Sequence, residues 1–156
     1  MYPDCDEILK MAPDYDIIPV CREIYADVIT PITLLRKLAA VSKRYYLLES
    51  VEGGEKWGRY SFLGFDPVMR VKCSCGKVTI EKDGEETEKV TDKPLEVLRE
   101  ILKDYKAPRL AGLPPFAGGF VGYFAYAMIG YAEPKLKIKK GTFNDYDMML
   151  FDKVIA

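Results

Sequence analysis

The segment 69–90, MRVKCSCGKVTIEKDGEETEKV, decides the fold. Apolar and polar residues alternate along it, which is typical of β-strands with one buried face. Two turn signals interrupt the alternation, Gly76-Lys77 and Asp83-Gly84. An Asp-Gly pair between alternating runs is a strong signal for a tight hairpin. The segment therefore predicts three consecutive antiparallel strands, with Lys82 and Glu85 as an opposite-charge pair at a solvated tip.

Helices are predicted on both sides of this segment. Thr30 is a good N-cap and Pro31 suits the first helical position of a helix that follows them. A second helix is predicted over roughly 94–106. The expected apolar faces are Leu34, Leu35, Leu38 and Val41 in the first helix, and Leu95, Leu98, Leu102 and Tyr105 in the second. The first fifteen residues are expected to form a short helix or an arm.

Alternating patterns predict the remaining strands. They cover 17–27, 45–51 and 59–67, and a last strand near the end of the chain, in 145–156. The Gly-rich, aromatic run after the second helix predicts a buried strand that passes into a helix. At 156 residues the chain is one domain by length. The order of elements predicts an α+β fold with a largely antiparallel sheet and flanking helices.

Charge and hydropathy narrow the choice of partners. The chain has 24 acidic and 23 basic residues, so there is no electrostatic reason to expect nucleic acid or an anionic membrane as a partner. No apolar run approaches the roughly 20 residues of a membrane-spanning helix. The N-terminus lacks the basic start and apolar stretch of a signal peptide. These features predict a cytoplasmic protein that binds neither nucleic acid nor membrane.

Histidine is absent from the chain, which excludes Ser-His-Asp and Cys-His catalytic sites. The four cysteines leave two alternatives open. Cys73 and Cys75 share one face of a predicted strand and could hold a soft metal or form a disulfide. Because no second cysteine pair lies at zinc-site spacing, we favour buried or partly buried reduced thiols over a metal site or a disulfide.

Two further patterns have ordinary structural interpretations. Asp145 and Asp147 would share one strand face, which favours a solvated edge over acid-base catalysis. The glycine clusters EGGEKWGR and AGGFVGYF match neither of the common nucleotide-binding loops, so turn and packing roles are favoured.

The turn between 45–51 and 59–67 carries the most informative polar groups. Glu49 and Ser50 end an apolar run, and Arg59 lies across the turn, where a hairpin-like return could place it opposite them. One interpretation is a salt-bridged hairpin end. The other is a site for a zwitterion, in which Glu49 faces an ammonium group, Ser50 hydrogen-bonds it and Arg59 holds a carboxylate. Trp57 is expected to be a packing residue of the turn.

Three segments in this order and spacing carry a family resemblance. They are IIPVCREIYADVITPITLLRKL, YYLLESVEGGEKWGRYSFLGFDP and LPPFAGGFVGYFAYAMI. Together they resemble the N-terminal region of anthranilate synthase component I. Family members often read GYxGYD where this chain has Ala125 and Ala127 in place of the Gly and the Asp. Component I of aminodeoxychorismate synthase is the runner-up within the family, and a stand-alone amino-acid-binding or scaffold module is an alternative of another class.

The resemblance implies a fold, a function and a site. It implies part of a β-sandwich with flanking helices, and 1–156 as an N-terminal regulatory domain without catalytic residues. The full-length enzyme would convert chorismate and glutamine-derived ammonia to anthranilate and pyruvate, using Mg²⁺ in a catalytic chorismate-binding domain and a glutamine amidotransferase subunit as partner. Tryptophan would be the allosteric effector, bound by Leu48, Glu49 and Ser50 of the LLES motif and by Arg59.

Overall fold

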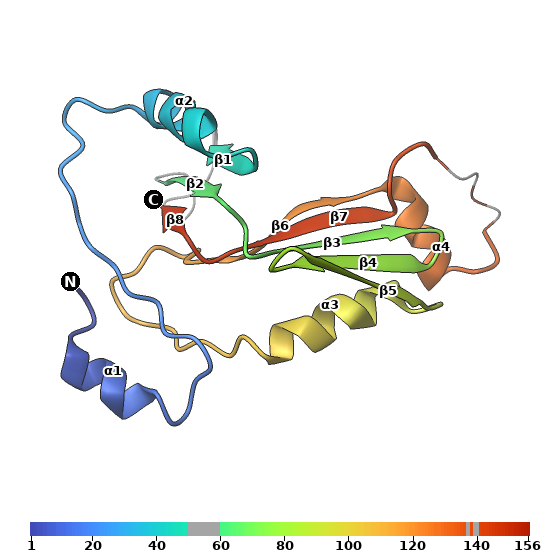
Figure 1. Cartoon of the computed structure of the whole chain (residues 1–156), viewed down its shortest axis with the longest axis horizontal. Helices are drawn as coiled ribbons and strands as arrows, with labels where there is room; N and C mark the ends of the chain where they lie inside the picture. Colours follow the sequence, from blue (N-terminus) through green and yellow to red (C-terminus); the bar gives the residue numbers. More distant parts are fainter. Residues whose placement is uncertain (50–59, 137, 139–140) are drawn as a thin grey trace. The chain divides into compact units, whose positions relative to one another are not determined.

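The computed structural model describes residues 1–49, 60–136, 138 and 141–156. They form two antiparallel sheets with flanking helices, so the predicted α+β fold is confirmed (Figure 1). The elements are α1 (Cys5–Met11), α2 (Pro31–Val41), β1 (Tyr45–Glu49), β2 (Ser61–Phe65), β3 (Met69–Ser74), β4 (Lys77–Lys82), β5 (Glu85–Val90), α3 (Pro94–Lys103), β6 (Gly119–Phe124), a 3₁₀ turn η1 (Tyr126–Met128), α4 (Ile129–Ala132), β7 (Tyr146–Phe151) and β8 (Val154–Ile155).

The chain divides into two compact units. Unit 1 comprises Met1–Asp66, Ile101–Ala117 and Lys153–Ala156, and unit 2 comprises Pro67–Glu100 and Gly118–Asp152. Each unit contains one of the two sheets. The prediction that 1–156 form a single N-terminal regulatory domain stays a prediction.

Unit 1 is built on the sheet β1-β2-β8. β1 and β2 are antiparallel, and Leu47 lies opposite Leu63. Helix α2 packs against both strands. Leu38 of α2 and Leu63 are both buried, because an amphipathic helix stabilises a small sheet by covering one of its apolar faces.

The two ends of α2 follow the sequence signals closely. The Thr30 hydroxyl accepts a hydrogen bond from the backbone N–H of Thr33 at 3.2 Å, and Pro31 occupies the first turn as predicted. At the other end, the buried Ser42 hydroxyl donates to the Arg44 carbonyl and accepts from the Asp66 backbone N–H. Ser42 therefore ties the connection between α2 and β1 to the end of β2.

Unit 2 is built on a five-stranded sheet of order β5-β4-β3-β7-β6. All neighbours are antiparallel. The central part of one face is the core, where Val71, Cys73 and Val78 are fully buried. Helix α3 runs along the strands (Figure 1), and the buried Tyr146 hydroxyl donates to the Pro94 carbonyl at the start of α3.

Both predicted hairpins of 69–90 are present. Asp83 and Gly84 have φ of 53° and 83°, as a two-residue hairpin turn with two left-handed positions requires. The other turn lies at Cys75 and Gly76, with φ of 53° and 78°, one residue earlier than the Gly76-Lys77 prediction. Cys75 is consequently an exposed turn residue and not a strand residue.

Three sequence predictions are wrong. Residues 17–27 do not form a strand: only Cys21 makes a bridge, to Tyr2, and Tyr25 is fully exposed. Val41 at the end of α2 is exposed. The buried face of α3 is Pro94, Val97 and Leu98, whereas Leu95 and Leu102 of the predicted stripe are exposed.

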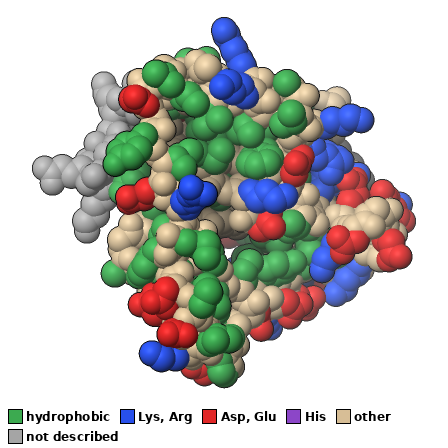
Figure 2. Space-filling view, turned by 60° about the vertical axis from the view of Figure 1, so that its left-hand side comes forward, with side chains coloured by type: hydrophobic (Ala, Val, Ile, Leu, Met, Phe, Trp, Pro, Cys, Tyr) green, Lys and Arg blue, Asp and Glu red, His purple; other side chains and the backbone are tan. Residues whose placement is uncertain are grey.

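The face drawn in Figure 2 has acidic and basic side chains interspersed, with hydrophobic side chains exposed between them. Among the helices of the described residues, none has the length and apolar character needed to cross a bilayer.

The contact between Gly64 and Tyr46 gives a stability prediction. The two residues lie opposite each other, and a Cβ added at Gly64 would lie 2.2 Å from the Tyr46 ring. Gly64→Ala should therefore lower the free energy of unfolding by about 1–3 kcal/mol, as overpacking does, although alanine in place of a strand glycine normally stabilises by about 0.5–1 kcal/mol. Urea unfolding followed by circular dichroism measures the change.

Gly130→Ala is the matched control, because among the described residues its new Cβ would approach only the Ile138 side chain, at 3.7 Å. We expect no loss of stability in that variant. Tyr46→Ala combined with Gly64→Ala should be less destabilising than the sum of the two single changes. A Gly64→Ala protein at least as stable as the parent would contradict the packing described here.

Candidate functional site

The described residues of the predicted site belong to strand β1, which pairs with β2. Glu49 is the last residue of β1 and lies opposite Ser61 of β2. The Ser61 hydroxyl donates a hydrogen bond of 3.5 Å to Oε1 of Glu49, and both side chains are at the surface end of the pair. The Glu49 carboxylate is exposed, so it is accessible to a ligand with a positive charge.

Leu48 lies on the other face of β1 because successive strand residues alternate. It is opposite Phe62 and is 47% exposed. Phe62 packs edge-on against Phe116, with ring centroids 5.7 Å apart, and stacks on Tyr60. Phe116 also contacts Tyr46 edge-on. Leu48 therefore adds an exposed apolar surface to an aromatic cluster, which we define as Tyr46, Tyr60, Phe62 and Phe116.

Burial raises the pKa of Tyr46 in this cluster to about 12. A phenol whose deprotonation is suppressed in this way stays neutral over the physiological range. The cluster is therefore an uncharged surface beside Leu48, suited to contact with an apolar or aromatic group.

Ser50, Arg59 and Trp57 lie outside the described residues. The prediction that Arg59 returns opposite Glu49 or Ser50 is therefore untested, and Ser61 is the residue that the structure places opposite Glu49. Of the four predicted site residues, Leu48 and Glu49 are described, adjacent in sequence and on opposite faces of β1.

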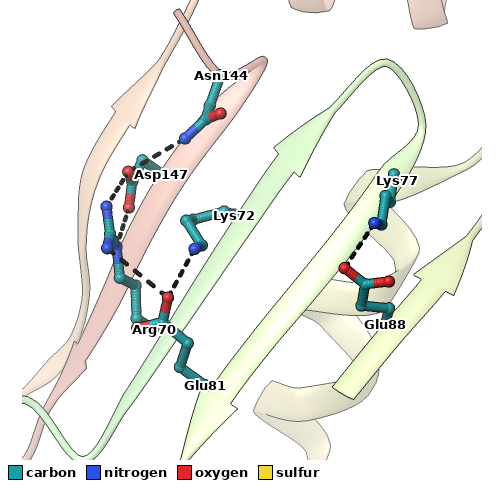
Figure 3. A network of polar contacts seen from close by, with 7 residues as sticks. All are labelled: Arg70, Lys72, Lys77, Glu81, Glu88, Asn144 and Asp147. Carbon is teal, nitrogen blue, oxygen red and sulfur yellow. Dashed lines mark hydrogen bonds and ion pairs between the residues drawn. The ribbon is translucent and has the colours of Figure 1, made fainter. Parts of the chain in front are cut away.

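A second polar group lies on one face of the sheet in unit 2 (Figure 3). The Arg70 guanidinium binds both oxygens of Asp147, at 2.8 and 2.6 Å. Asn144 donates to the same carboxylate at 3.4 Å. Glu81 lies 3.8 Å from Arg70 and 2.6 Å from Lys72. The hydrogen bond to Asp147 raises the pKa of Arg70, so the guanidinium stays charged.

Asp145 belongs to a different network. Its Oδ2 accepts hydrogen bonds from the Tyr131 hydroxyl and from the Cys75 backbone N–H, both at 2.7 Å, and lies 3.7 Å from the Cys73 sulfur. Cys73 and Asp147 are on opposite faces of the sheet, because Asp147 pairs with Lys72. The expectation that Asp145 and Asp147 share a solvated face is therefore wrong, and Asp147 is only 8% exposed.

These networks hold the sheet together and offer little chemistry. The Asp147 carboxylate accepts charge-assisted hydrogen bonds from Arg70, and the Asp145 carboxylate accepts two short hydrogen bonds. Neither aspartate is therefore placed to take a proton from a substrate. Burial is the main cause that raises the pKa of the Cys73 thiol, which keeps it protonated and unreactive. The expectation of buried or partly buried thiols holds for Cys73 and Cys21, whereas Cys5 and Cys75 are exposed. In the part of the chain that the structure describes, no three histidine, cysteine, aspartate or glutamate residues gather as a metal site would require.

The sequence of the chain is similar to those of known proteins. The chain is 46% identical over 133 residues to anthranilate synthase component 1 of Acetivibrio thermocellus, a match that covers 85% of the chain and 26% of that relative. It is 43% identical to the Pseudomonas aeruginosa protein of the same name, over 84% of the chain and 27% of the relative. The chain is a homologue of part of anthranilate synthase component I.

The anthranilate synthase component I relatives are much longer than this chain. In Aquifex aeolicus the identity is 35%, over 93% of the chain and 29% of the relative. The chain thus spans a little over a quarter of the length of these relatives. A crystal structure of anthranilate synthase component I from Streptococcus pneumoniae matches with a TM-score of 0.48 and 26% identity, over 86% of the chain and 28% of that protein. No protein-family model matches the chain.

Sequence reasoning missed the aromatic cluster and both networks. The Arg70–Asp147 pair joins residues 77 positions apart, and only the strand register brings them together. A charged residue inside an otherwise apolar strand, as at Asp147 in YDMMLF, is the signal that could have indicated a buried partner. Phe116 comes from a loop of unit 1 with no periodic pattern, so no local signal identifies it.

The Arg70–Asp147 pair gives a prediction for a double-mutant cycle. Arg70→Met leaves a carboxylate that is 8% exposed without its bidentate donor, so the free energy of unfolding should fall by about 1–3 kcal/mol. Asp147→Asn should be destabilising as well, and the double variant should lose less than the sum of both. Urea unfolding of the four proteins measures the coupling.

The matched control is the Lys77–Glu88 pair, whose side chains are 53% and 48% exposed (Figure 3). Lys77→Met should change stability by less than about 1 kcal/mol, because exposed ion pairs contribute little. Equal losses in the free energy of unfolding for Lys77→Met and Arg70→Met would contradict the prediction that partial burial makes the Arg70–Asp147 pair more important for stability.

Proposed function

We propose that this chain acts as the N-terminal, tryptophan-sensing part of anthranilate synthase component I. The single observation that carries the proposal is the 46% identity over 133 residues to anthranilate synthase component 1. The match covers 85% of the chain, and the few unmatched residues at its ends cannot extend as far as β1 or β2. Both strands and the residues between them are therefore part of the match. The LLES segment therefore lies inside the matched region.

The proposed ligand is free tryptophan, a zwitterion with a large aromatic side chain. Glu49 offers an exposed carboxylate to the ammonium group, and Ser50 adds a hydrogen bond. Leu48 and the adjacent aromatic cluster lie on the opposite face of β1 from Glu49 and offer apolar surface suited to an indole ring that reaches around the end of the strand. Arg59 is proposed to bind the tryptophan carboxylate. These groups recognise and position a ligand, and none of them is assigned a catalytic role.

The reaction is proposed to belong to the part of the protein that this chain does not match. There, a chorismate-binding domain would convert chorismate and ammonia to anthranilate and pyruvate, with a glutamine amidotransferase subunit as the source of ammonia. Mg²⁺ would serve that domain, and the described residues of this chain do not supply a set of ligands that fits it. We propose that the protein works in the cytoplasm.

The proposal predicts the outcome of two activity assays. The 156-residue chain alone should form no anthranilate from chorismate, ammonium and Mg²⁺. A chimera, in which this chain replaces the matched segment of the Acetivibrio thermocellus relative, should form anthranilate and be inhibited by tryptophan. Anthranilate fluorescence measures both. Anthranilate formed by the chain alone, or a folded chimera without activity, would contradict the proposal.

Ser50 provides a test of the tryptophan site in that chimera. Ser50→Ala should raise the inhibition constant for tryptophan by about 10- to 100-fold, since it removes a hydrogen bond to a charged group. The uninhibited kcat/KM should not change. Ser74→Ala, the same change at an exposed serine of unit 2, is the control and should leave inhibition unaltered. Unaltered inhibition in Ser50→Ala would favour the plain hairpin interpretation.

A further inference from the structure

The two edges of the five-stranded sheet have opposite chemistry. β5, at one edge, has the sequence EETEKV, and all six residues are exposed. Four of them are charged, which is the usual protection of an open strand edge against pairing with other chains. β6, at the other edge, has the sequence GFVGYF and carries no charged residue. Within the described residues, β6 is therefore the unprotected edge.

The pairing of β6 with β7 defines which backbone groups face outward. The Ala125 N–H donates to the Asp145 carbonyl, and Phe124 lies opposite Tyr146. Because hydrogen-bonded and non-hydrogen-bonded pairs alternate along antiparallel strands, Val121 and Tyr123 direct their backbone groups to β7. Phe120, Gly122 and Phe124 direct theirs away from it. This edge presents a row of backbone donors and acceptors that can pair with another strand.

Exposed aromatic side chains extend the same edge. Tyr123 is 40% exposed, and Tyr126 and Phe143 beside it are 82% and 75% exposed. Phe124 is 53% exposed on the opposite face of β6, where it meets Tyr146 edge-on. Tyr123 and Phe143 are in edge-on contact, with ring centroids 6.4 Å apart. With Ala125 and Tyr126 they line a shallow hollow of about 330 Å³. Large aromatic side chains grouped in this way are typical of surfaces that become covered by a partner.

We propose that β6 is a docking edge, to which the unmatched part of anthranilate synthase component I adds a β-strand with apolar side chains over this hollow. The proposal rests on the proposed function. The relatives carry about 70% of their length outside the matched region, so their polypeptides have further chain that could supply such a strand. An intramolecular strand pairs at high effective concentration, whereas a second copy of the chain must also offset lost translational freedom.

Hydrogen–deuterium exchange tests the docking edge on two proteins. In the 156-residue chain, the amides of Phe120, Gly122 and Phe124 should exchange rapidly. In the intact anthranilate synthase component 1 of Acetivibrio thermocellus, the amides at the aligned positions should exchange at least about 100-fold more slowly. The match covers enough of the chain to include β6. The outward amides of β5, at Glu86 and Glu88, are the control and should be rapid in both proteins.

Each outcome decides the proposal. Rapid exchange at the aligned β6 positions of the intact relative overturns it, and the assays of anthranilate formation and tryptophan inhibition would be unaffected by that result. Protection of β6 in the 156-residue chain that increases with concentration, together with dimers in analytical ultracentrifugation, would assign the edge to a second copy and also overturn it. Slow exchange confined to β6 of the intact relative supports the docking edge.

A charged side chain introduced into β6 provides a second test of the docking edge. Phe124→Lys in the 156-residue chain puts a charge at the edge, and the same change at the aligned position of the intact relative should disrupt docking there. We expect the isolated chain to keep its unfolding midpoint within a few degrees, whereas the relative should lose protection along β6. Thr87→Lys on the already charged strand β5 is the control. Equal effects of the two changes in the relative would count against the proposal.

Discussion

The five-stranded sheet depends on the ion pair between Arg70 of β3 and Asp147 of β7. The guanidinium binds both carboxylate oxygens, and the pair crosses the sheet diagonally, since Arg70 lies opposite Met149. A slip of β7 by one residue would turn Asp147 to the face of Val71 and Cys73, which are fully buried. A carboxylate there would have no cationic partner, and its desolvation would destabilise the fold by several kcal/mol. The pair thus fixes the register of β7.

The position of β6 follows from that register. β7 lies between β3 and β6, and nearly all of its residues are buried. Tyr123 lies opposite Asp147, and Gly122 lies opposite Met148, where an added Cβ would come within 2.0 Å of the Asp147 carbonyl oxygen. Only glycine allows β6 to approach β7 so closely. The same register sets which amides of β6 face outward and which aromatic side chains surround the hollow.

Local chemistry made some of these features predictable from the sequence. The N-cap at Thr30 and the turn at Asp83-Gly84 depend on side chains and dihedral angles within a few residues, and both are as expected. The strand predicted over 17–27 failed because alternation describes a half-buried strand only when a partner strand exists, and here Cys21 alone finds one. Val41 and Leu95 are exposed although both were predicted to belong to the buried faces of their helices. Apolar periodicity predicts the buried face of a helix only approximately, because the neighbouring elements decide which helical turns are covered. Of the predicted site, Leu48 and Glu49 could be placed from the LLES run, whereas the aromatic cluster needed tertiary contacts.

The hydrogen-bond and ion-pair partners of the acidic side chains distinguish those that stabilise the sheet from one that is accessible to a ligand. Asp147 is bound by Arg70, Glu81 by Lys72 and Asp145 by Tyr131, so these carboxylates maintain the sheet of unit 2. Among the described residues, Glu49 accepts a 3.5 Å hydrogen bond from the Ser61 hydroxyl, and it is exposed. The chain also contains no histidine to act as a base at neutral pH. Its accessible groups are therefore a carboxylate on one face of β1 and apolar surface on the other face in unit 1, and an uncharged strand edge in unit 2. Under our proposals, the groups in unit 1 bind a ligand and the edge in unit 2 binds a partner strand.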